Sequence, residues 1–247
     1  MLRESGIALA PGPSARVMQA LCDAGIFALG GVLVGASAFG VLGNLLGVHL
    51  PPRREPEDSI DIAFPAKMPA APSVIEQLEM GLSPGLRFSQ QRSCTLFADR
   101  GKQVHVNFFA PQLSSKLSPI RISTFAAFAQ PTRYLELLLE RVRPAAFVGK
   151  SSSLVTVPDP ARFALHATMA ARVCPAPHGR DAELRRASAL LDVLAQDHPE
   201  ALRCAREAID AHSLGARELL REGLAELSVD LPQVAERLKC VWPSVSE

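Results

Sequence analysis

The sequence lacks an excess of charge of either sign. Lysine and arginine number 26 and aspartate and glutamate 25, which gives a net charge of +1 at pH 7. Proteins that hold nucleic acid or an anionic membrane over a large surface usually carry many more basic than acidic residues. The overall charge therefore gives no argument for either kind of partner.

The sequence also lacks paired cysteines and has few aromatic residues, which make up 5% of the chain. The cysteines are odd in number, scattered and without a Cys-x-x-Cys pair: Cys22, Cys94, Cys174, Cys204 and Cys240. Disulfide frameworks and structural zinc sites normally use even or closely spaced sets. The pattern argues against both and predicts reduced thiols in a cytoplasmic protein.

Charged residues are absent from residues 24–50, a stretch long enough to span a bilayer. The run is rich in glycine and alanine, so its mean hydropathy is weaker than its length suggests. It also lies too far from the N-terminus for a signal peptide. We favour a buried helix–turn–helix or strand–turn–helix piece and expect no membrane contact, with a membrane anchor over residues 24–50 as the alternative.

Hydrophobic periodicity predicts an α+β fold with two lobes. Residues 1–160 are expected to form a small mixed β-sheet lobe with flanking helices, and residues 161–247 an all-helical lobe. The elements expected in the first lobe are helices at Ser14–Ala24, Ser37–Leu46, Pro72–Met80 and Thr132–Val142, strands at Ser59–Phe64 and Leu154–Val157, and a hairpin of Ser93–Ala98 with Gln103–Phe109.

Two short motifs carry the chemistry. Gly35-Ala36-Ser37 forms a glycine turn in front of a helix, and Ser59-Ile60-Asp61 opens an alternating strand. Residues two apart on a strand share a face, so Ser59 and Asp61 are expected to point the same way. Carboxylates at that spacing can hold a pair of metal ions, but here the first of the two positions is a serine.

Several segments together resemble a family of bacterial nucleotidyltransferase-like proteins of the DNA polymerase β superfold. They follow in order along nearly the whole chain: Leu29–Val48, Ser59–Phe64, Val104–Pro111, Val157–His166 and the helical tail from Asp181. The resemblance implies a small mixed-sheet catalytic lobe with a helical lobe. It also implies Mg²⁺-dependent transfer of a nucleoside monophosphate from a nucleoside triphosphate (NTP) to an acceptor, which the sequence does not identify as protein or RNA.

The resemblance also assigns roles, residue by residue. Where the family strand reads Asp-Ile-Asp this chain has Ser59-Ile60-Asp61, and Asn107 stands at the position of a third carboxylate. Asp61 is thus implied as the catalytic and metal-binding residue that remains. The residues implied to contact nucleotide are Gly35, Ala36, Ser37, Ser59, Asn107 and His166. The lysine that usually stands beside that histidine is Ala167 here.

These replacements predict a degraded metal site. Magnesium prefers anionic oxygen ligands, and removal of one charge-stabilising group commonly costs about 10²–10³ in rate. We therefore expect a weakly active or non-catalytic protein, with at most weak magnesium binding, that binds nucleotide or a partner. The alternative is an active enzyme that uses Asp61 with a non-standard second carboxylate such as Asp58, which a β-bulge would have to turn to the same face.

Overall fold

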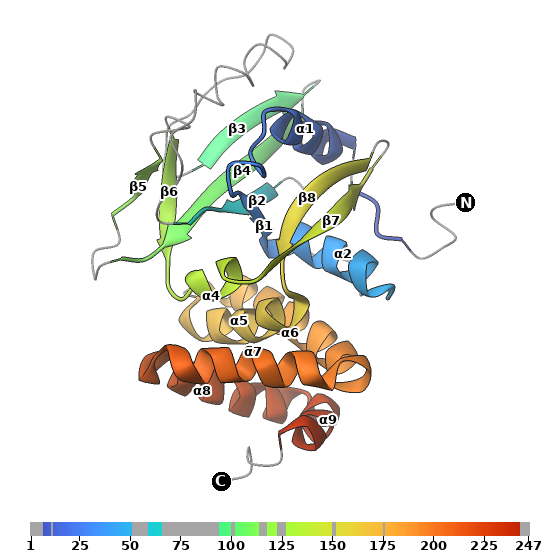
Figure 1. Ribbon diagram of the computed structural model, residues 1–247, viewed down its shortest axis with the longest axis vertical. Helices are drawn as coiled ribbons and strands as arrows, with labels where there is room; N and C mark the ends of the chain where they lie inside the picture. The colour runs from blue at the N-terminus through green and yellow to red at the C-terminus, as the bar shows by residue number, and fades with distance from the viewer. Residues whose placement is uncertain are drawn as a thin grey trace. The chain divides into compact units, whose positions relative to one another are not determined.

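The computed structural model describes residues 7–10, 12–50, 59–65, 94–99, 102–113, 118–122, 127–149, 152–174 and 176–242. The chain separates into two compact units, Met1–Pro158 and Asp159–Glu247. The first unit holds the β-sheets and the second consists of helices (Figure 1). The α+β fold class predicted from the sequence is therefore confirmed.

A six-stranded mixed sheet organises the first unit. Its strands are β1 (Val32–Val34), β2 (Ser59–Ala63), β3 (Cys94–Asp99), β4 (Lys102–Pro111), β5 (Ile120–Ile122) and β6 (Ala127–Thr132). Their order is β1-β2-β4-β6-β5, and β3 also pairs with β4. β2 and β6 run parallel to β4, whereas β1 pairs antiparallel with β2, β3 with β4 and β5 with β6. A separate hairpin joins β7 (Val142–Val148) to β8 (Ser152–Pro158).

The two faces of the sheet differ in burial because side chains alternate along each strand. On β2 and β4, Ile60, Ile62, Val104 and Val106 are fully buried. Their neighbours on the other face, among them Ser59, Asp61, His105 and Asn107, are half-buried or exposed. The apolar face belongs to the core, and the polar face is left to carry the candidate site.

The uncharged run at residues 24–50 folds as a turn, strand β1 and helix α2 (Gly35–Leu46), which ends at Gly47. A helix of this length spans about 18 Å, against about 30 Å for the hydrocarbon core of a bilayer. Within the described part of the chain, no helix is long and apolar enough to cross a membrane. The prediction of a buried strand–turn–helix piece is confirmed, and the single membrane helix over residues 24–50 is wrong. Burial is not complete around α2, since Leu45 is 41% exposed.

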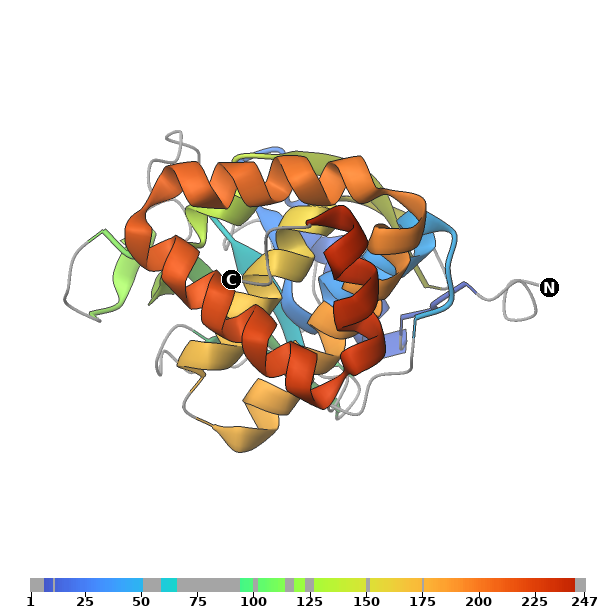
Figure 2. The same cartoon turned by 90° about the horizontal axis from the view of Figure 1, so that it is seen from below.

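The second unit contains the helices expected from the periodicity, viewed from below in Figure 2. They are α5 (Pro160–Val173), α6 (Pro177–Asp197), α7 (Pro199–His212), α8 (Leu214–Asp230) and α9 (Pro232–Val241). Helix α5 packs against α6, α7 and α8. The Asp159 carboxylate caps α5 by accepting a hydrogen bond from the Ala161 N–H at 3.1 Å, which satisfies one of the free donors at the helix start.

The segment around residue 135 differs from its prediction. Instead of a helix over Thr132–Val142, it contains the end of β6, the four-residue helix α4 (Glu136–Leu139) and the start of β7. Tyr134 adopts a positive φ of 57°, which a regular right-handed helix does not allow. The predicted helix Pro72–Met80 lies outside the described residues.

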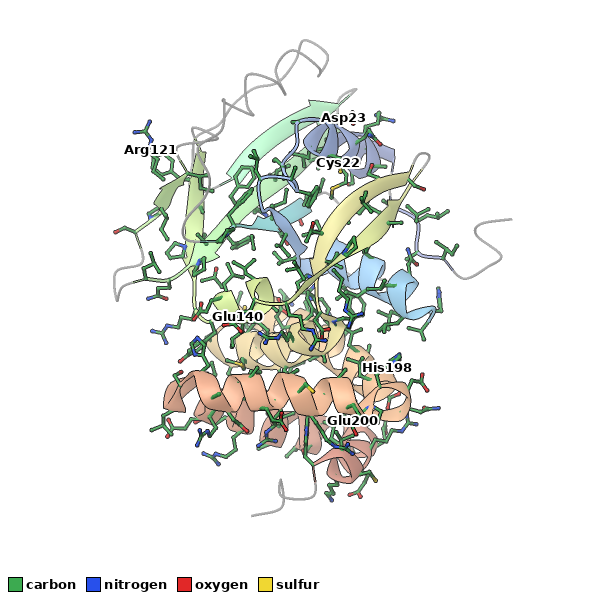
Figure 3. The ribbon with its side chains drawn as sticks, viewed as in Figure 1. Cys22, Asp23, Arg121, Glu140, His198 and Glu200 are labelled. Atoms are coloured by element: carbon green, nitrogen blue, oxygen red, sulfur yellow. The ribbon has the colours of Figure 1, made fainter. Side chains whose placement is uncertain are left out.

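The thiol of Cys22, on helix α1 (Gly12–Asp23), donates a hydrogen bond to the Leu154 carbonyl oxygen of β8 at 3.5 Å. Figure 3 shows it next to Asp23. Burial, together with the charge of Asp23, raises the pKa of Cys22 to about 11, although a hydrogen bond with Ser153 lowers it in part. The thiol is thus protonated at neutral pH.

We expect Cys22 to react with iodoacetamide at pH 8 roughly a hundredfold more slowly than an ordinary exposed thiol, because the thiolate is the nucleophile. The exposed Cys204 and Cys240 serve as internal references. Mass spectrometry of peptides after timed alkylation measures all three. Equal rates would contradict the raised pKa.

Candidate functional site

The glycine turn places the backbone of Gly35 directly against the side chain of Asp61. Strand β1 pairs with β2 so that Val34 lies opposite Asp61, and α2 begins at the next residue. Gly35 has a φ of +63°, and a Cβ atom there would overlap Asp61 Oδ2 and lie 3.1 Å from its Cγ. Only glycine satisfies both the left-handed backbone and the close approach.

Asn107 lies on the other side of Asp61. The parallel pairing of β2 with β4 sets Asp61 opposite Asn107, and the Asn107 Nδ2 atom donates a hydrogen bond to Asp61 Oδ1 at 2.8 Å. Both side chains are half-buried. The Asp61 carboxylate at the centre of the candidate site therefore lies between two neighbours. One is the backbone of Gly35, which follows β1, and the other is the side-chain amide of Asn107 on β4.

Ser37 and Ser59 lie at the same corner of the sheet. The Ser37 hydroxyl donates a hydrogen bond to the Ser59 carbonyl oxygen at 3.2 Å, and Ser37 is only 2% exposed. This bond fastens the first turn of α2 to the start of β2. The Ser37 hydroxyl could donate to a ligand only if it gave up its hydrogen bond to the Ser59 carbonyl oxygen. Ala36, between Gly35 and Ser37, is half-buried.

His166 belongs to a different part of the chain. It lies on α5 in the second unit and is half-buried, next to the buried Ala167. The residues gathered within the first unit are thus Gly35, Ala36, Ser37, Ser59, Asp61 and Asn107. Asp58, the alternative second carboxylate, falls outside the described residues.

The open face of the sheet continues beyond Asn107 to residues that the sequence analysis did not single out. Phe109 follows on β4 and pairs with Gln130 of β6. No strand was predicted at residues 127–132, so nothing in the sequence placed these side chains beside the Asp61 strand. The segment Ala127–Thr132 shows no alternation of polar and apolar residues and contains Pro131, so no sequence signal marks it as a strand.

Comparison with known proteins decides the family. A family model described as nucleotidyltransferase matches residues 13–210. The chain belongs to this nucleotidyltransferase family. A solved structure of an antigenic nucleotidyltransferase-like protein from Paracoccidioides brasiliensis is similar at 10% sequence identity and a TM-score of 0.43, covering 96% of this chain and 100% of that one. Among curated proteins no significant match is found.

Members of the nucleotidyltransferase family typically use Mg²⁺ and an NTP, which raises the question of whether the residues present fit two metal ions. Asp61 supplies one carboxylate, and one of its oxygens accepts a hydrogen bond from an amide N–H. An N–H donor cannot ligate a cation. Among the described residues, no three or more His, Cys, Asp or Glu side chains are grouped so that they could hold a metal ion. The described donor set does not fit a pair of magnesium ions, which require several anionic oxygens.

Proposed function

We propose that this nucleotidyltransferase-family protein binds an NTP at the Gly35 turn and transfers nucleotides weakly or not at all. The observation that supports the proposal best is the hydrogen bond from Asn107 Nδ2 to Asp61 Oδ1. In a two-metal site both of these positions would present oxygens to a cation. Here one Asp61 oxygen instead accepts a hydrogen bond from the Asn107 amide N–H.

Binding of the phosphates would rely on the backbone. The first N–H groups of a helix have no partner within the helix, and together with the helix dipole they attract anions. Helix α2 has no acidic residue in its own first turn, and Gly35 leaves the backbone uncovered by a Cβ. Against this, the Asp61 carboxylate lies beside the same turn and repels a phosphate, so the affinity is expected to be low.

Catalysis would suffer more than binding. Loss of a single group that stabilises charge in the transition state commonly costs about 10²–10³ in rate, and Ser59 and Asn107 are both neutral. We infer a role as a nucleotide-dependent binding or regulatory component of the cytoplasm, of bacterial origin, with residues 1–160 and 161–247 acting as its two domains. The scattered cysteines and the resemblance in sequence support this assignment.

The test is a pair of assays on the purified full-length chain. Incubation with radiolabelled NTPs and Mg²⁺ or Mn²⁺ should give no label transfer above background, while equilibrium dialysis should detect weak NTP binding. Asp61→Asn should bind NTP in EDTA at least as tightly as the wild type, because the substitution removes a repelling negative charge.

The opposite results would support an active enzyme. Metal-dependent label transfer that Asp61→Asn abolishes would overturn the proposal and favour Asp61 acting with a second carboxylate such as Asp58. An absence of NTP binding under every metal condition would overturn the nucleotide-binding role itself.

A further inference from the structure

The polar face of the sheet extends beyond the Asp61 site to four more residues on strands β4, β6 and β5. Asp61 pairs with Asn107, Phe109 of the same strand pairs with Gln130, and Phe128 on β6 pairs with Arg121 on β5. Paired residues, and residues two apart on one strand, share a face. Each of these side chains therefore lies on the same face of its paired strands as the next, and this set is here called the β4–β6–β5 face, defined by Phe109, Phe128, Gln130 and Arg121.

This face is open, unlike the opposite side of the same strands. Phe128 is 39% exposed, while Ala129 next to it is fully buried. Gln130 and Arg121 are exposed and Phe109 is half-buried. An aromatic ring kept at a sheet surface with polar neighbours offers a flat face for stacking, and bases of nucleic acids stack on such rings whatever their identity.

The charge of this part of the chain is also one-sided, although the charge of the whole protein is balanced. Residues 101–135 contain no aspartate or glutamate, and their charged residues are Lys102, Lys116, Arg121 and Arg133. Within the described residues the Arg121 guanidinium forms no ion pair or hydrogen bond, and Figure 3 shows its side chain extending away from β5. A cation held at the sheet edge in this way suits a phosphate group.

We propose that the β4–β6–β5 face binds a single-stranded nucleic acid, with a base stacked on Phe128 and a backbone phosphate at Arg121. The inference deepens the proposed function, on which it rests for the nucleotide at Asp61. In the strand order β2-β4-β6-β5, three spacings of about 4.8 Å each separate β2 from β5. A strand of several nucleotides covers this distance and places its end near the NTP.

Fluorescence anisotropy with the full-length protein and short labelled oligouridine or oligothymidine tests the inference and compares RNA with DNA. Phe128→Ala should weaken binding roughly thirtyfold, the middle of the range for loss of one stacked base. Arg121→Gln should weaken binding several-fold and lower the slope of log K against log salt by about one, because one phosphate contact is lost.

Matched controls come from the β7–β8 hairpin of the same unit. Leu154→Ala removes another exposed apolar side chain, 72% exposed, and Arg143→Gln removes another exposed arginine. Both variants should bind the oligonucleotides as the wild type does. Circular dichroism of all four variants verifies that each is folded.

NTP binding by the same variants separates this inference from the proposed function. We expect Phe128→Ala and Arg121→Gln to bind NTP normally. Weakened NTP binding with unchanged oligonucleotide binding would mean that the face holds the NTP itself, and would overturn the inference while leaving the proposed function intact. Absent oligonucleotide binding, or binding that none of the substitutions alters, would also overturn it.

Discussion

Replacing Ser59 and Asn107 with aspartate should create a site that binds divalent metal ions much more tightly than the wild-type protein does. In the double variant S59D/N107D, three carboxylates share the polar face of β2 and β4, since Ser59 lies two residues before Asp61 on one strand and Asn107 lies opposite Asp61 on the next. We expect affinity for Mn²⁺ to rise at least a hundredfold over the wild type, which corresponds to about 2.7 kcal/mol.

The physical reason lies in the contact that the substitution replaces. Asn107 Nδ2 donates a hydrogen bond to Asp61 Oδ1 at 2.8 Å. An aspartate at position 107 would set two carboxylates at about that separation, where both cannot be ionised without a cation or a proton between them. In the absence of metal, one carboxyl of the pair therefore has its pKa raised in the folded state.

The sign of the resulting pH effect follows. A carboxyl whose pKa is higher in the folded than in the unfolded protein binds more protons when folded, so stability is lost as the pH rises from its unfolded pKa to its folded pKa. Asn107→Asp should thus be less stable relative to wild type at pH 7 than at pH 4, when metal is absent. Saturating Mn²⁺ should restore the stability that the variant loses at pH 7.

Thermal unfolding in EDTA and in Mn²⁺, together with electron paramagnetic resonance of free Mn²⁺, measures both effects. Asn44→Asp is the matched control: Asn44 is also a half-buried asparagine of the first unit, and its side chain bonds to the backbone of Ala8. It adds the same charge away from Asp61 and should show no response to metal. If the S59D/N107D protein folds but neither binds Mn²⁺ nor is stabilised by it, the described arrangement of residues 59, 61 and 107 would be contradicted.

The elements that the sequence predicted are those with strong local signals. Alternation in Ser59–Phe64 and Val104–Phe109 indicated β2 and β4, and the periodicity after residue 160 indicated an all-helical region, which contains α5 to α9. Each of these patterns reflects burial of one face or one stripe, a property that neighbouring residues encode by themselves.

What could not be predicted depends on partners far away in the sequence. Strands β5 and β6 are three and six residues long, and β6 contains Pro131, which normally argues against a strand within a sheet. Register is likewise set by non-local pairing: alternation showed which face Asp61 and Asn107 occupy but not that they are opposite each other. The proposed role of Arg121 and Phe128 depends on the pairing of β5 with β6, which could not be predicted from the sequence.

Gly35→Ala should be among the most destabilising single substitutions in the first unit, by about 3 kcal/mol. The left-handed backbone at φ +63° costs an alanine about 1–2 kcal/mol, and the added methyl group overlaps Asp61 Oδ2. Moving the carboxylate away would also strain its hydrogen bond with Asn107. Urea denaturation followed by circular dichroism measures the loss in the free energy of unfolding.

Helix α2 contains its own control at the opposite end. Gly47 has nearly the same backbone conformation, with φ +68°, but a Cβ there would meet no atom within 4 Å. Gly47→Ala therefore incurs the backbone cost alone, and we expect about 1 kcal/mol. The difference between the two variants isolates the contact of residue 35 with Asp61.

A double-mutant cycle identifies that contact directly. In an Asp61→Ala background the Oδ2 and Cγ atoms are gone and the remaining Cβ lies 3.2 Å from the position of the new methyl group, a distance that a small backbone shift relieves. Gly35→Ala should then cost about 1 kcal/mol, so that the coupling between positions 35 and 61 is about 2 kcal/mol. Additive effects would show that the glycine is required by its backbone conformation alone. A large coupling would mean that Gly35 is needed to make room for the carboxylate at the centre of the proposed nucleotide site.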